Sequence, residues 1–335
     1  MSARSPKRAG NSPAGTPRAK RNRRIYGYFF ALLVCAGIGW FLYSRWLQGK
    51  PELPNLPAHP DRIVAAQIQD AAETVRRSPR AGLAWGKLGM IFHAYLFEDE
   101  ARVCFVNAQR FDPAEPRWPY FEGVILLASD PDAALRHLAR AVELCPSTPD
   151  TPRLQYARAA AEQGQGVAAE VQFQQLVRLN PAHAPALLGL ARVEDARQQL
   201  DKAAEYLGRC VESPFTKRDA LLLMAKVEGK RGNALAAEKA AIAARALPPD
   251  QSWPEPYTDE IIRLQIGLNQ LVAQAERLLK GGRDNEAEGV IGRMVKQYAN
   301  APEPWLLDGR LRLPIGRVPD ADLLVRSPCK PFPIR

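Results

Sequence analysis

The chain has 335 residues, with 46 Lys and Arg against 36 Asp and Glu, and a formal net charge of +10. Its five cysteines and four histidines form no CxxC pair, no disulfide framework and no recognisable metal-ligand spacing. The sequence also has no nucleophile-elbow, metalloprotease, phosphate-loop or dinucleotide motif. We therefore expect a protein that is not an enzyme, with no catalytic, cofactor-binding or metal-binding residues.

The positive charge is concentrated at the N-terminus. Eight basic residues and no acidic residue lie within residues 1–24: Arg4, Lys7, Arg8, Arg18, Lys20, Arg21, Arg23 and Arg24. The remaining 38 basic and 36 acidic residues nearly cancel, so the rest of the chain lacks the basic face that phosphate binding needs. We predict no nucleic-acid partner and interpret residues 1–24 as a cytoplasmic tail that sets membrane topology. Contact with lipid headgroups and a nucleic-acid arm are the alternatives.

The next segment has the length and composition of a membrane span. Residues 25–44 carry no charge and would form a helix of about 30 Å, the thickness of the hydrocarbon core. Aromatic residues mark both ends of this segment: Tyr26, Tyr28, Trp40, Tyr43 and Trp46. We interpret residues 25–46 as an uncleaved transmembrane signal anchor. A cleaved signal peptide is the rival interpretation, but its apolar core would be shorter and would end in small residues.

The charge asymmetry around this span predicts its direction. The positive-inside rule keeps the basic tail in the cytoplasm and sends everything after residue 50 across the membrane. In a bacterium the chain would thus be a single-pass inner-membrane protein with a periplasmic body. Ala31, Cys35 and Gly39 recur every four residues and offer a small-residue face for a homodimer.

Prolines follow the span at every third residue, at positions 51, 54, 57 and 60. Polyproline II has three residues per turn, so residues 47–60 are predicted to form a semi-rigid stalk. A ligand for a proline-recognition domain is the alternative.

Asp61 follows the prolines as a candidate N-cap. An apolar stripe at Val64, Ile68, Ala71 and Val75 follows it, which predicts an N-terminal capping helix over residues 61–79.

A pattern with a period of 34 residues begins after this helix. Its first copy consists of Trp85, Leu88, Gly89, Ala101, Phe105, Ala108 and Pro113. Later copies keep the frame at Gly123, Ala134, Leu138, Ala141, Pro146, Ala169, Phe173, Pro181, Leu187, Leu190, Ala191, Ala203, Leu207 and Cys210. A fifth copy is placed on Leu223, Ala236, Ala243 and Pro248, a sixth on Leu271, Ala275, Ala287 and Ile291, and a seventh opens at Trp305–Gly309. An irregular Pro-rich joint at Ser252–Pro256 separates the fifth copy from the sixth.

This period and these residues resemble the tetratricopeptide repeat (TPR) family. The resemblance implies an all-α, right-handed solenoid of helix–turn–helix repeats over residues 80–313, preceded by the one transmembrane helix. The cysteines at 104, 145 and 210 then fall on second helices, where small apolar residues pack well. Residues 314–335 are rich in proline and form either a degenerate last repeat or a truncated end.

The resemblance also implies a concave groove lined by the first helix of each repeat. Carried over by position, the partner-binding residues are Arg117, Tyr120, Leu154, Arg158, Leu188, Arg192 and Arg218. Arg158 and Arg192 hold the same position in adjacent repeats, so we expect them side by side and suited to an acidic group on a peptide. The alternative is that they are solvated or paired with Glu162 and Asp195. Chaperone-tail binding is not expected, because Gly86 and Met90 stand where the carboxylate clamp needs Lys and Asn.

These inferences predict a membrane-anchored scaffold that binds a protein or peptide partner in its groove on the extracytoplasmic side. An accessory subunit of a secretion, pilus or cytochrome-maturation complex, which contacts that machine through its span, is the alternative. A nonspecific spacer is a third possibility. The first function needs the groove, the second needs the span, and the third needs neither.

Overall fold

The computed structural model describes Trp40 and residues 51–312. The predicted basic tail, all but one residue of the predicted anchor and the predicted end at 314–335 lie outside the described residues. The chain divides into two compact units, Met1–Glu52 and Leu53–Arg335. Within the described residues, no helix combines the length and the hydropathy that a membrane crossing requires.

All regular secondary structure between residues 51 and 312 is α-helical, which agrees with the predicted all-α class. The helices are α2 (Arg62–Arg77), α3 (Gly82–Ala94), α4 (Glu98–Phe111), α5 (Arg117–Leu126), α6 (Pro131–Leu144), α7 (Thr151–Glu162), α8 (Gly166–Leu179), α9 (Ala184–Ala196), α10 (Leu200–Cys210), α11 (Lys217–Lys230), α12 (Ala234–Arg245), α13 (Pro256–Leu264), α14 (Leu268–Lys280), α15 (Asp284–Gln297) and α16 (Pro302–Arg312).

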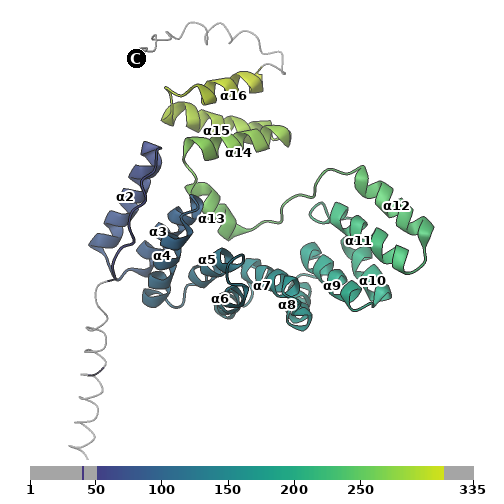
Figure 1. Cartoon of the computed structure of the whole chain (residues 1–335). Helices are drawn as coiled ribbons and strands as arrows, with labels where there is room; N and C mark the ends of the chain where they lie inside the picture. The colour runs from purple at the N-terminus through teal and green to yellow at the C-terminus, as the bar shows by residue number, and fades with distance from the viewer. Residues whose placement is uncertain (1–39, 41–50, 313–335) are drawn as a thin grey trace, which may run out of the picture. The chain divides into compact units, whose positions relative to one another are not determined.

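From α3 to α12 consecutive helices pack in pairs and each pair packs on the next, and α14, α15 and α16 pack together after the connection (Figure 1). From α3 to α11 the first helices of successive pairs begin 33 to 35 residues apart, and α14 and α16 begin 34 residues apart. This is the helix–turn–helix spacing that the sequence period predicts. The regular spacing is interrupted once, after α12, where a long connection leads into α13 (Figure 1).

Large aromatic side chains fill the space between the first two pairs. Trp85 and Phe105 are fully buried, and the Phe105 ring stacks on Phe121 at 5.5 Å between centroids. A Cβ atom on Gly89 would lie 2.9 Å from the Phe105 ring, so only glycine permits this close approach. The first copy of the repeat therefore packs as its residue types predict.

Asp61 is the helix N-cap that the sequence predicts. The Asp61 side chain accepts a hydrogen bond from Ile63 N at 2.9 Å and begins α2, which packs on α3. The buried stripe differs from the prediction by one residue, because Ala72 is fully buried and Ala71 only partly so. The second oxygen of Asp61 accepts from Leu268 N at 3.0 Å and from the Tyr298 hydroxyl at 2.8 Å, so this one carboxylate also joins α14 and α15 to α2.

The predicted register of the fifth copy is wrong by one residue. Ala236 and Ala243 are exposed, whereas Ala240 and Ala244 are buried against α11. Adjacent alanines on α12 satisfy the pattern equally well, so only the packing against α11 selects between them. The structure thereby keeps the frame that begins at Gly82.

We expect Phe105→Ala to lower the free energy of unfolding by about 3–5 kcal/mol, because it leaves a cavity in the fully buried aromatic cluster. Urea denaturation followed by circular dichroism would measure the change. Val106→Ala is the matched control, since Val106 is on the same helix and exposed. Equal stability of the two variants would remove Phe105 from the core.

Candidate functional site

The seven predicted groove residues lie on the first helices of four adjacent pairs. Arg117 and Tyr120 are on α5, Leu154 and Arg158 on α7, Leu188 and Arg192 on α9, and Arg218 on α11. Three of these placements need correction. Leu154 is fully buried in the core, and Tyr120 and Leu188 are buried as well. Neighbouring helices cover them, and a later part of the chain also covers Tyr120.

That later part is residues 250–266, here called the return segment. It contacts the first helices in reverse chain order, beginning at α11 and ending at α2 and α3. It includes the predicted irregular joint at Ser252–Pro256, whereas α13 has no counterpart among the predicted elements. In the structure the return segment occupies the groove in which a partner is predicted to bind.

The return segment begins by capping α11. The Asp250 carboxylate accepts hydrogen bonds from Arg218 N at 2.8 Å and Asp219 N at 2.9 Å. No side chain at the N-cap of α11 itself makes such a bond, so Asp250 satisfies helix-end donors that would otherwise lack a protein partner. Arg218 thus contributes its backbone to this contact.

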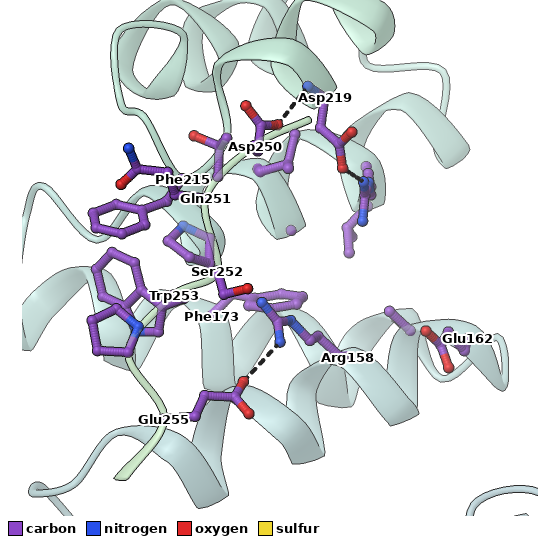
Figure 2. A pocket seen from close by; sticks show the side chains of 18 of the residues that line it. Arg158, Glu162, Phe173, Phe215, Asp219, Asp250, Gln251, Ser252, Trp253 and Glu255 are labelled. Atoms are coloured by element: carbon purple, nitrogen blue, oxygen red, sulfur yellow. Dashed lines mark hydrogen bonds and ion pairs between the residues drawn. The ribbon is translucent and has the colours of Figure 1, made fainter. Parts of the chain in front are cut away.

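Trp253 occupies a seat built by three residues of the array. Its ring lies 4.5 Å from the His183 ring and 5.0 Å from the Phe215 ring, the latter edge to face. The indole Nε1 donates a hydrogen bond to Asp150 Oδ2 at 3.1 Å, and Figure 2 shows the ring beside Phe215. We call His183, Phe215 and Asp150 the indole seat.

His183 and Asp150 hold each other in place. His183 Nδ1 accepts from Ala186 N at 3.2 Å, which leaves Nε2 as the donor to Asp150 Oδ2 at 2.8 Å. Burial acts to raise the pKa of Asp150, but the hydrogen bonds from His183 and Trp253 outweigh it and lower the pKa below its ordinary value of 3.8. The seat therefore keeps a carboxylate that accepts from the indole.

Two carboxylates of the return segment pair with predicted groove arginines. Glu255 Oε1 lies 3.2 Å from Arg158 Nη1, as Figure 2 shows, and Glu260 Oε2 lies 3.0 Å from Arg117 Nη1. The predicted alternative that Arg158 pairs with Glu162 is not what the structure has. Arg117 is also held by Glu115 at 2.9 Å, so it is less available to a partner than Arg158.

Arg192 and Asp195 do not pair with each other either. Arg192 lies 3.3 Å from Asp219, and both side chains are more than half exposed. Asp195 instead is buried and paired with Lys226 at 2.9 Å and with Lys230. The predicted alternative that Arg192 pairs with Asp195 is therefore wrong in its partners, because the next helix, α11, supplies the countercharges.

Residues 252–257 of the return segment present alternate side chains to the array. Trp253, Glu255 and Tyr257 face it and are partly or fully buried, whereas residues 252, 254 and 256 are exposed. Tyr257 packs edge to face on Tyr120 at 5.0 Å. In an extended peptide successive side chains point to opposite sides, so every second residue contacts the surface on which the peptide lies.

An open pocket remains beside the return segment, with a volume of about 1220 Å³. Arg158, Arg192 and Leu188 line it together with Val167 and the return segment itself. The two arginines predicted to be neighbours thus contribute to the same pocket. Figure 2 looks into this pocket and shows Arg158 and Glu162 on one helix, with Glu255 opposite Arg158.

Sequence reasoning missed the indole seat and the return segment. Two signals were present. The connection from Arg245 to Pro256 is longer than most helix–helix connections, and long loops are frequently functional. Within it, aromatic and acidic residues alternate with small residues and prolines at positions 252–257.

No protein-family model and no curated protein matches the chain. Among solved structures, the chain is similar to PilW, described as a widely conserved type IV pilus biogenesis factor, with 24% identity over 56% of this chain and 94% of PilW (TM-score 0.44). It is similar to MamA, with 17% identity over 56% of this chain and 97% of MamA (TM-score 0.46). It is also similar to PilF of Pseudomonas aeruginosa, with 14% identity over 73% of this chain and 99% of PilF (TM-score 0.44). Likeness at this level carries no argument about function.

The Asp150 carboxylate predicts a pH dependence of stability. The pKa of Asp150 is lowered in the folded chain. Its carboxylate therefore contributes fully to the free energy of unfolding above about pH 4, and this contribution is lost as the pH falls through the pKa of the folded state. We expect Asp150→Asn to cost about 1–3 kcal/mol at pH 7 and less at pH 3, since the buried donors lose a charged acceptor. Urea denaturation between pH 3 and 7 would measure both.

The exposed Asp70→Asn is the matched control for this experiment and should leave stability within about 0.5 kcal/mol of the parent. A constant difference between Asp150→Asn and the parent at all pH values would contradict the assignment.

Proposed function

We propose that the chain is a non-catalytic scaffold that binds a protein or peptide partner in its groove. The observation that carries the proposal is the return segment: the groove already holds an extended stretch of polypeptide through alternate side chains. A surface that recognises an extended peptide of its own has the geometry for recognising one from a partner.

The open pocket supplies the contact for that partner. Among the residues that the structure describes, Arg192 forms an ion pair only with Asp219, at 3.3 Å; this pair is exposed, and exposed ion pairs contribute about 0–1 kcal/mol. A ligand carboxylate can therefore replace Asp219 at small cost, while the exposed Val167 offers apolar surface in the same pocket. A partner segment that carries an acidic group next to an apolar side chain fits these features.

We propose further that residues 25–46 tether the scaffold to a bacterial inner membrane, with the array in the periplasm. The support lies in the sequence, namely an uncharged stretch of about 20 residues with eight basic residues before it. The predicted stalk then connects this span to the array, and its described part does not project freely, because Leu53 and Leu56 pack against the core of the array.

A photoreactive residue placed at Val167 tests the scaffold function in intact cells. Val167 lines the pocket and is 71% exposed, so we expect it to form a discrete covalent adduct with the partner. The adduct should fall at least tenfold when Arg158 and Arg192 are both changed to Glu, because charge reversal repels an acidic ligand. Leu235, which is 67% exposed on α12, is the control position and should give no such adduct.

The same experiment separates the scaffold from the membrane-machine accessory. If the adduct survives the double charge reversal but disappears when residues 25–46 are replaced by an unrelated span, contacts through the membrane carry the function and the groove does not. Equal adducts from positions 167 and 235 would also contradict the scaffold proposal.

A further inference from the structure

We propose that residues 250–255 are an exchangeable internal ligand, and that the external partner presents the same chemistry, a tryptophan followed two residues later by a carboxylate. The inference rests on the proposed scaffold function and specifies its partner. It depends on three properties of the structure: how the return segment is held, what its seat recognises, and how it is connected.

The first part of the return segment is held mainly by side chains. A single backbone–backbone hydrogen bond, from Gln251 N to Pro214 O at 3.0 Å, joins residues 250–255 to the helix pairs that the structure describes. The following helix α13 differs, because Tyr257 and Ile261 are buried in the main core and α13 packs on α3. Residues 250–255 can therefore leave the groove while α13 stays in place.

The residues of the indole seat are held in position without Trp253. Its rings and its carboxylate belong to the array, where His183 is fixed by its bonds to Ala186 N and to Asp150. When Trp253 leaves, Asp150 keeps the His183 donor but loses the indole donor. An unoccupied seat thus presents two aromatic faces and one carboxylate that accepts an N–H.

These groups select an indole followed by an acid. A tryptophan ring fills the space between His183 and Phe215 and also supplies the donor that Asp150 accepts, whereas a phenylalanine ring brings no donor. In an extended peptide, residues two apart lie on one side about 6.5 Å from each other. Arg158 is placed to meet a carboxylate at that second position, as it meets Glu255 in the return segment.

The connection of the return segment explains why it competes with a partner without excluding it. Residues 246–255 join α12 to α13 and include prolines at 248, 249 and 254. A segment tethered at both ends has an effective concentration in the millimolar range, so a free peptide with the same contacts binds weakly to the parent chain. Removing the tryptophan anchor of the internal segment should open the seat to the free peptide.

A labelled synthetic peptide with the sequence of residues 248–258 tests this competition with the full chain in detergent, by fluorescence anisotropy. Trp253→Ala should bind the peptide at least tenfold more tightly than the parent, and Arg158→Glu in the Trp253→Ala background should reverse that gain. A peptide with alanine in place of its tryptophan should not bind. Trp305→Ala is the matched control, because Trp305 lies on α16, and this variant should behave as the parent does.

If Trp253→Ala loses helicity, the same binding experiment is done with Glu255→Gln. That variant keeps the indole, removes the charge that meets Arg158, and should raise peptide affinity about two- to fivefold. The proposal is overturned if a folded variant binds no more tightly than the parent, or if peptides with and without tryptophan bind equally. Such a failure, with the adduct at Val167 retained, would leave the scaffold function standing and make residues 250–255 a fixed wall of the pocket.

Discussion

The seating of Trp253 between His183 and Phe215, with its N–H on Asp150, determines how the rest of the site is arranged. Three separate parts of the array contribute to this one contact, so it fixes the path of the connection that follows α12. With the indole in place, Glu255 meets Arg158 and the chain continues into α13. The predicted groove is thereby divided into a filled part and an open pocket.

The interrupted period follows from the same path. In a stacked array each pair buries its apolar face on a neighbour, so a sixth pair would be expected directly after α12. The chain instead turns back, and the N–H of Leu268 at the start of α14 donates to Asp61, which also caps α2. As a consequence Leu235 and Ile242 of α12 remain exposed, and the Asp61 carboxylate joins α2 to α14.

Local sequence was sufficient to predict the helix–turn–helix repeats, and it was insufficient for α13 and for the contents of the groove. Phe105 and Asp61 act locally, one within a repeat and one at a helix start, so their patterns predict the packing and the cap that the structure has. The alanines of α12 allow two registers, and no local signal separates them. The partner of Arg158 is 97 residues away in a proline-rich stretch, and only the folded path brings Glu255 to it.

The central claim is that the indole seat is occupied by Trp253 in solution. Fluorine NMR of the chain labelled with 5-fluorotryptophan tests it directly, with the Trp253 signal assigned by its loss in Trp253→Phe. The account predicts a Trp253 signal displaced from that of a solvent-exposed fluorotryptophan, because two rings lie within about 5 Å, and a further displacement in Phe215→Leu. A Trp253 signal at the position of free fluorotryptophan, unchanged by Phe215→Leu, would contradict it.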